Sequence, residues 1–323
     1  MVHIARLALR YAPSPLSCAV CALVLGAAVC VPARAADAPP PPSPTLGVEK
    51  LDATLYRISG TASGGVLVLV GAKGLLLVDA EDAAHAAELD SVLRTISTLP
   101  VETIVNTHYH FDHIGGNERY AREGAEVIAH ENLWTQALKD TVIADYGDWH
   151  RKAAPAGAKP TRTFADTLRL DHEGDPVVLS HVPAAHSDND VMVSFPRHNV
   201  LHTGDVVEIG AAPFVDLWAG GTVGGMINGI DRFLRASNDE TRIVPGHGSI
   251  ITRAELREYR AMLATLANRA VESIAEGRDL EGFLALAPAA QFEDRLGGAR
   301  GARNLSALLF YGLNGMKREA AAP

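Results

Sequence analysis

Residues 107–113 read Thr-His-Tyr-His-Phe-Asp-His, which places three histidines and one aspartate within six consecutive positions. Imidazole and carboxylate groups are protein ligands for zinc, iron and manganese. The chain has only 13 histidines in 323 residues, so this density favours a metal site over a chance grouping on a polar loop. The apolar residues Val101, Ile104 and Val105 directly precede the cluster and predict a buried strand. The sequence therefore predicts a strand whose following loop carries metal ligands.

The spacing within the cluster separates two sets of ligands. His108 and His110 alternate, so a short loop can aim both side chains at one point. Asp112 and His113 are adjacent and point in different directions, so they can reach a second ion. The glycines at 115–116 allow a tight entry into the next helix. One short segment can thus contribute ligands to two neighbouring ions.

The segment from Asn106 to Asn117 resembles the His-x-His-x-Asp-His motif of the metallo-β-lactamase superfamily. This resemblance implies three further ligands downstream, and the chain has a match for each. His186 follows the strand-like residues 176–182, Asp205 lies in a Gly-Asp step, and His247 lies in a Gly-His-Gly turn. The matches occur in the order of the family and extend from about residue 46 to about residue 262.

The resemblance also implies how the ligands are shared between two divalent ions. Zn²⁺ is the expected metal, with iron or manganese as alternatives. One ion would keep an open position for water or hydroxide, and a second ion roughly 3.5–4 Å away would complete the arrangement used in hydrolysis. Asp112 is also expected to orient the nucleophile, as the catalytic residue. The expected ligands are His108, His110 and His186 for the first ion, Asp112, His113 and His247 for the second, and Asp205 as a bridge.

Two further polar residues lie near these motifs. Asp79 ends the apolar run 75–78 and resembles the acid that holds the second ring nitrogen of a ligating histidine. A helix cap before the helical stretch 83–96 is the other interpretation of Asp79. His202 is expected to pack or form hydrogen bonds rather than bind metal.

The pattern of apolar runs predicts a mixed α/β fold, and the resemblance implies a four-layer αββα sandwich formed by a single domain over residues 46–323. The expected strands lie near residues 48–58, 65–71, 74–79, 101–106, 125–129, 166–171, 176–182, 190–195 and 199–203. The expected helices lie near residues 84–96, 116–123, 224–237, 252–276 and 304–316, and residues 131–165 are less regular.

Residues 1–35 have the features of a secretory signal peptide, with Arg6 and Arg10 before the apolar stretch 16–31 and small residues before a cut after Ala35. An uncleaved anchor and lipid attachment at Cys30 are the alternatives. Residues 36–45 are proline-rich and predict an extended linker. The sequence thus predicts an exported protein, periplasmic or secreted, whose mature part does not insert into a membrane.

All three cysteines, Cys18, Cys21 and Cys30, lie within the predicted signal peptide. The mature chain would therefore hold its metals through nitrogen and oxygen alone. Loss of residues 1–35 would change the formal charge from −9 to −12, which argues against binding of nucleic acid or an anionic membrane. Residues 206–246 are also too few for the extra domain of superfamily nucleases.

The expected reaction is hydrolysis of an ester, lactone, thioester or strained cyclic amide in a small-molecule substrate, with an ion lowering the pKa of bound water to about 7. Three regions are candidates for the substrate pocket. They are the glycine-rich turn 59–65, the side chains of Trp134, Tyr146, Trp149 and His150, and the loop that contains Pro213, Phe214, Asp216 and Trp218.

Other functions remain as alternatives. A zinc β-lactamase is the nearest, although such enzymes generally have cysteine or serine at the position of Asp205. An iron-dependent redox enzyme of the same fold is the second; diiron flavoprotein oxidases usually have glutamate at the position of His110, whereas persulfide dioxygenases use a single iron. A metal-binding protein without turnover is the third, and it would be expected to lack a ligand.

Overall fold

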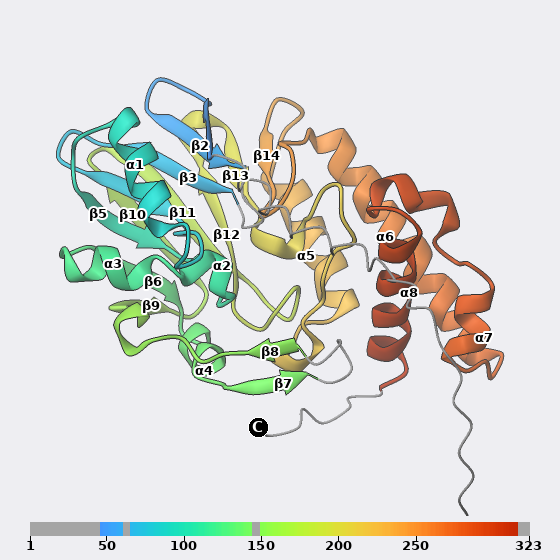
Figure 1. The fold of residues 1–323 in the computed structure, drawn as a ribbon. Coiled ribbons are helices and arrows are strands. Elements are labelled where there is room, and N and C mark those ends of the chain that lie inside the picture. The colour runs from blue at the N-terminus through green and yellow to red at the C-terminus, as the bar shows by residue number, and fades with distance from the viewer. Residues whose placement is uncertain (1–45, 61–64, 144–148, 316–323) are drawn as a thin grey trace, which may run out of the picture. The chain divides into compact units, whose positions relative to one another are not determined.

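The computed structural model describes residues 46–60, 65–143 and 149–315 and contains a seven-stranded sheet, in which the apolar runs at residues 66–70 and 75–78 form two inner strands (Figure 1). Strands β1 to β4 pair antiparallel in chain order, and β5, β6 and β9 then add parallel to β4. The strands of this sheet are β1 (Gly47–Lys50), β2 (Leu55–Ser59), β3 (Val66–Val70), β4 (Leu75–Val78), β5 (Val101–Val105), β6 (Glu126–His130) and β9 (Arg162–Phe164).

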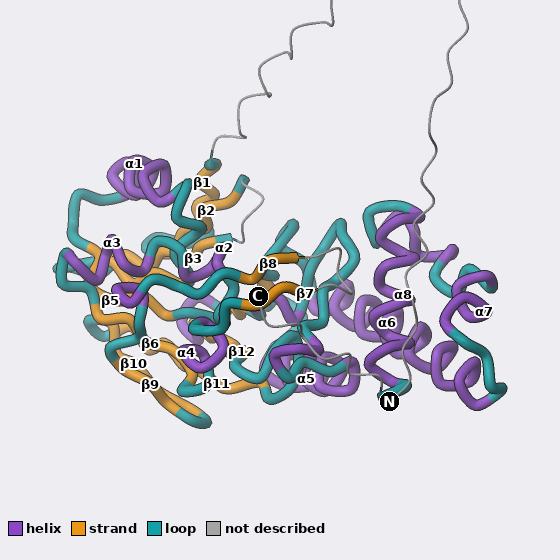
Figure 2. The backbone as a smooth tube through the Cα atoms, turned by 60° about the horizontal axis from the view of Figure 1, so that its bottom comes forward, coloured by secondary structure: helices purple, strands orange, loops and turns teal. Residues whose placement is uncertain are grey.

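A second sheet of five strands lies against the first and runs in chain order from β10 to β14. Its first four strands pair antiparallel, and β14 adds parallel to β13. The strands are β10 (Thr167–His172), β11 (Asp175–Val182), β12 (Asp190–Phe195), β13 (Val200–His202) and β14 (Arg242–Val244). A separate two-stranded sheet pairs β7 (Thr141–Ile143) antiparallel with β8 (Trp149–Arg151) (Figure 2).

Both faces of β3 and β4 are buried, which explains why these two strands read as continuous apolar runs. In β3, for example, Leu67 and Leu69 belong to the core between the two sheets, together with Leu179 and Phe195 from the second sheet. The alternate residues of β3 face the outer side of the first sheet. Each sheet therefore needs a helical layer on its outer face.

The helices supply these two outer layers. Helices α1 and α3 cover the first sheet, whereas α5, α6, α7 and α8 pack on one another and on the second sheet (Figure 1). The resulting order of helix, sheet, sheet and helix is the expected αββα sandwich. The helices are α1 (Ala86–Ile96), α2 (Phe111–Ile114), α3 (Asn117–Arg122), α4 (Leu133–Ala137), α5 (Val223–Ala236), α6 (Arg253–Ala275), α7 (Leu280–Ala285) and α8 (Ala299–Leu313).

Several element boundaries differ from those expected. The expected strand at 48–58 is two strands, because the turn at residues 51–54 reverses the chain and lets β1 pair with β2. The final helix begins at Ala299 rather than at Asn304. The short elements α2, α7 and β14 were not expected, since three to six residues show too little periodicity. The region 131–165 contains α4, β7, β8 and β9.

The expected signal peptide and proline-rich linker lie outside the described residues. Their assignment to residues 1–35 and 36–45 therefore remains a prediction from the sequence. Among the described helices, none has the length and apolar character needed to cross a membrane.

Candidate metal centre

The predicted ligands begin at the carboxyl end of β5, beside the end of its parallel neighbour β4. Asp79 follows β4 with a φ of 65°, an uncommon backbone conformation for a residue other than glycine. Its carboxylate accepts hydrogen bonds from the backbone N–H of Thr107 at 2.8 Å and from the hydroxyl of Thr107 at 2.7 Å. Asp79 thus fixes the start of the histidine-rich loop, and α2 continues that loop.

Three histidines converge in the first group of predicted ligands. Nε2 of His108 and Nε2 of His186 each lie 3.0 Å from Nδ1 of His110. Ligand atoms around tetrahedral zinc stand about 3.3 Å apart, because each Zn–N bond is about 2.0–2.1 Å long. The three nitrogens therefore surround a volume of the size that one ion needs.

The buried environment of this group suits neutral imidazoles, the form that binds metal. Burial lowers the pKa of His186 to about 4. Burial, together with the positive charge of His113, lowers the pKa of His108 well below its usual value. Both rings are therefore neutral over the physiological pH range.

The second group consists of Asp112, His113 and His247. Oδ2 of Asp112 lies 3.4 Å from Nε2 of His113 and 3.3 Å from Nε2 of His247. Burial disfavours the charged imidazolium of His247, but the carboxylates of Asp205 and Asp112 overcome this effect and raise the pKa of His247 to about 11. The carboxylates thus make this group a strong site for positive charge.

Asp205 lies between the two groups. Its Oδ2 atom is 3.3 Å from Nε2 of His247 and 3.6 Å from Nε2 of His108, and its Oδ1 atom is 3.3 Å from Nε2 of His113. Oδ1 of Asp205 and Nε2 of His113 are both buried and have no hydrogen-bond partner among the described residues. Burial of polar atoms without partners is unfavourable, and a cation between them would satisfy both.

All seven predicted ligands therefore come together. Within each of two groups, the ligand atoms lie within 4.8 Å of one another. The nitrogen and carboxylate donors fit zinc, iron or manganese. The groups are His108, His110, His186 and Asp205, and Asp112, His113 and His247.

Hydrogen bonds orient the rings through their other nitrogen atoms, as is usual for metal-binding histidines. Nδ1 of His113 lies 2.8 Å from Oδ2 of Asp79, which is the contact expected of that acid. The alternative role of Asp79 as a helix cap is wrong, because the N-cap residue of α1 is His85. Nδ1 of His186 lies 2.9 Å from the carbonyl oxygen of Phe214. Because these partners hold Nδ1, the Nε2 atoms of His113 and His186 point into the centre.

Asp216 is the partner of His110, with Oδ2 located 3.1 Å from Nε2 of the ring. The same carboxylate accepts a hydrogen bond from the hydroxyl of Tyr109, and Nη1 of Arg151 donates to that hydroxyl at 2.7 Å. Burial opposes ionisation of Asp216, but its hydrogen bonds with His110 and Tyr109 lower its pKa to about 2. Asp216 was expected in a pocket wall; its contact with His110 spans 106 residues and leaves no local pattern in the sequence.

The other candidate pocket residues are divided among several environments. The ring of Phe214 lies 5.9 Å from those of His110 and His186, and Trp218 stacks on it. Trp134 packs on a small core cluster, and Pro213 lines a hollow beside α8. His150 lines a cavity beside His110. Tyr146, residues 61–64 of the glycine-rich turn and the side chain of Trp149 lie outside the described part of the structure.

Gly246, which precedes His247, permits a close approach of the backbone to Asp205. A Cβ atom at Gly246 would lie 1.8 Å from Oδ1 of Asp205, which no side chain tolerates. His202 is buried, with its ring nitrogens near the carbonyl oxygen of Gly65 and the N–H of Gly204, so it has the expected hydrogen-bonding role.

Comparison with curated proteins reveals distant relatives. The alpha subunit of 2,4-dinitroanisole O-demethylase from a Nocardioides species is 26% identical over 57% of this chain and 52% of its own length. A linear primary-alkylsulfatase from a Pseudomonas species is 25% identical over 42% of this chain and 32% of its own. A type 2 metallo-beta-lactamase from a Bacillus species is 25% identical over 57% of this chain and 66% of its own. The chain thus spans about half of the first relative and a third of the second.

Solved structures show the same fold. A metallo-beta-lactamase from Pontibacter korlensis matches with a TM-score of 0.56 and 22% identity, over 68% of this chain and 99% of its own. A sec-alkylsulfatase from a Pseudomonas species matches with a TM-score of 0.63 and 20% identity, over 82% of this chain and 50% of its own. A family model described as the metallo-beta-lactamase superfamily covers residues 60–247, which is more than half of the chain. The protein therefore belongs to the metallo-β-lactamase superfamily.

Proposed function

We propose that the protein is a binuclear metal-dependent hydrolase that cleaves an ester, lactone, thioester or cyclic amide. The observation that carries this proposal is the position of Asp205, whose two carboxylate oxygens face the histidines of both ligand groups. An acid with contacts to both groups suits a bridge between two ions held side by side, the arrangement used in hydrolytic two-metal sites.

The residues that would hold the ions follow from the two groups. The first ion would be held by His108, His110 and His186, and the second by Asp112, His113 and His247, with Asp205 shared. When bound, such ions supply an activated water molecule and polarise the oxygen atom of the scissile group. Zn²⁺ fits the tetrahedral spacing of the three histidine nitrogens, and iron or manganese fits the same donor types.

The protein's own residues would orient the reaction at the exposed side of the centre. The side chains of Asp112 and His247 retain 16% and 24% of their exposure, whereas those of His108 and His186 are buried. Substrate and water must therefore approach from the side of Asp112. Its carboxylate is placed to accept a hydrogen bond from the attacking water and hold a lone pair of that water toward the substrate.

The relatives support cleavage reactions of this general kind. Their names describe a β-lactamase, an alkylsulfatase and an O-demethylase subunit, so the fold is used for bonds to both nitrogen and oxygen. β-Lactam hydrolysis is a second candidate, favoured by three type 2 metallo-beta-lactamases among the relatives. We also propose that the protein is exported after cleavage behind Ala35, which N-terminal sequencing of the cell-free or periplasmic protein tests.

A substrate panel tests the function. Purified protein is loaded with zinc, manganese or iron and assayed on nitrocefin, an acyl-homoserine lactone, aryl carboxylic esters, a glutathione thioester and an aryl sulfate. We expect turnover of at least one carboxylic substrate, with two ions per chain by elemental analysis and loss of activity on chelation. Full activity in metal-free protein would refute the mechanism. A single bound iron with oxygen consumption would favour the redox alternative.

A further inference from the structure

A cavity of about 440 Å³ opens beside His110. Its walls come from the metal-binding loop with α2, from the end of α4, and from residues 150–155 at the end of β8 and directly after it. Its volume falls within the range of small-molecule sites. Because His110 belongs to the first ligand group, a molecule bound here would lie next to the proposed reaction centre.

Most of the cavity wall is apolar. Phe111, Ile114, Ala137 and Ala154 contribute to it. Phe111 is 61% exposed, although the predicted ligands on either side of it are buried (His110) or half-buried (Asp112). Leu138, which follows the wall residue Ala137, is 53% exposed. Large apolar side chains left in water around a hollow indicate a surface that an apolar ligand can cover.

The cavity wall also carries positive charge. Arg151 is 6% exposed, and its buried Nε atom has no hydrogen-bond partner among the described residues. Lys152 is exposed on the same wall. The one carboxylate among the wall residues, that of Glu118, is paired with Arg122 at 2.7 Å.

The negative charge nearest to Arg151 is already shared. Oδ2 of Asp216 lies 3.7 Å from Nη1 of Arg151, but the same carboxylate serves His110 and Tyr109. Arg151 thus keeps N–H groups that can donate to a ligand, and the positive charge of Lys152 is also available to it. A buried guanidinium is a strong site for an anion, because charge-assisted hydrogen bonds are stronger in a protein than in water.

We propose that this cavity binds the apolar part of an amphiphilic anion, whose negative group is recognised by Arg151 and Lys152. This inference rests on the proposed function, because the cleaved bond would then lie at the His110 end of the cavity. The substrate class is therefore a carbonyl compound with an alkyl or aryl body and a negative charge.

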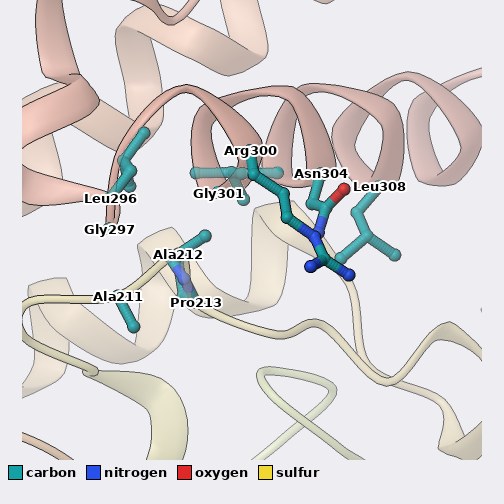
Figure 3. Close-up of a pocket in the computed structure, with 10 residues that line it drawn as sticks. Ala211, Ala212, Pro213, Leu296, Gly297, Arg300, Gly301, Asn304 and Leu308 are labelled. Carbon is teal, nitrogen blue, oxygen red and sulfur yellow. The ribbon is translucent and has the colours of Figure 1, made fainter. Parts of the chain in front are cut away.

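A different hollow of about 260 Å³ lies between the loop 211–213 and α8, with Arg300 and Asn304 projecting from the helix (Figure 3). None of the predicted ligands lines it. Arg300 is exposed and offers a matched arginine away from the reaction centre.

Titration calorimetry on the purified full chain tests binding without any need for turnover. The probes are octanoate, octylphosphonate, 1-octanol and acetate. We expect both eight-carbon anions to bind at least ten times more tightly than octanol, which lacks the charge, and than acetate, which lacks the chain. The two anions distinguish a carboxylate site from a phosphonate site.

Charge and shape variants locate this binding. Lys152→Glu should weaken binding of octanoate at least fivefold, whereas the equal charge change Lys159→Glu, at an exposed residue outside the cavity, should not. Ala153→Trp should obstruct the cavity and weaken binding of octanoate and octanol alike, in contrast to Ala254→Trp on α6. Arg151→Gln should remove the preference for anions, and Arg300→Gln should keep it.

Equal binding of all four probes, or equal effects of the Lys152 and Lys159 variants, would overturn the inference. A parallel series of 4-nitrophenyl esters from acetate to decanoate measures the preference in kcat/KM. If calorimetry gives the expected order but neither these esters nor any carboxylic substrate of the functional panel is hydrolysed, the cavity assignment holds and the proposed function fails. If the esters are hydrolysed without any preference for chain length, the proposed function holds and the cavity assignment fails.

Discussion

Oδ1 of Asp205 lies 3.3 Å from Nε2 of His113, and both atoms are buried without a hydrogen-bond partner among the described residues. Burial opposes the charge on each side chain. The histidines around Asp205 nevertheless lower its pKa well below the usual value, and the carboxylates around His113 raise the pKa of that ring. A bound cation would therefore change the charge state and the contacts of this pair more than those of the other residues in the centre.

Asp205→Asn tests the proposed bridge with little change in side-chain volume. The amide oxygen of asparagine can still bind one metal ion, but the variant lacks the negative charge that Asp205 shares between the two ligand groups. We expect the metal content to fall from two ions per chain to about one and kcat to fall by at least a hundredfold. Elemental analysis and a hydrolysis assay measure both. Two tightly held ions with unchanged kcat would show that Asp205 does not bridge.

Asp79→Asn tests the support of the second site. The asparagine can still accept a hydrogen bond from Thr107, but it no longer offers a charged partner to Nδ1 of His113. Loss of such a partner costs about 10–100-fold in metal affinity or activity. Competition with a chromogenic chelator measures the affinity. Asp82→Asn is the control, since Asp82 contacts residues 84 and 85 rather than a predicted ligand.

The ligand cluster could be predicted because its chemistry is concentrated in one segment. His108, His110, Asp112 and His113 share a loop at the end of β5, and a parallel sheet brings the residue after β4 to the same edge. The distant ligands His186, Asp205 and His247 were found through the family resemblance. Neither spacing nor composition alone places them within reach of the loop.

The supporting network could not be predicted, because it depends on tertiary contacts. Arg151 and Asp216 are separated by many residues, and the fold brings them 3.7 Å apart with the hydroxyl of Tyr109 hydrogen-bonded to both. The sequence likewise suggested candidate pocket aromatics, but Trp134 is partly buried and packs against a core cluster. Whether an aromatic residue lines a pocket or packs against the core depends on its burial, and the sequence around a single residue does not reveal its burial.

Gly246→Ala tests the close packing around the bridge. The added Cβ atom would lie 1.8 Å from Oδ1 of Asp205, so the carboxylate or the turn must move. We expect loss of metal together with destabilisation of about 1–3 kcal/mol. Gly224→Ala is the matched control, because its Cβ meets open space on α5 and alanine favours a helix by about 1 kcal/mol. Urea unfolding and elemental analysis separate the two variants.

Acidification should remove the second ion before the first. In the metal-free protein burial opposes the charge on His247, but Asp205 and Asp112 raise its pKa to about 11, so a metal must displace a proton there throughout the neutral range. Binding that releases one proton weakens about tenfold for each unit of pH lost. His186, with a pKa lowered by burial to about 4, stays neutral until the pH approaches 4 and releases no proton on binding. Dialysis of the loaded protein from pH 8 to pH 5.5 should therefore leave about one ion per chain by elemental analysis.

The ion that is retained at pH 5.5 should be lost in the variant His186→Ala and kept in the variant His247→Ala. Simultaneous loss of both ions from the unaltered protein, or the opposite pattern in the two variants, would contradict this order.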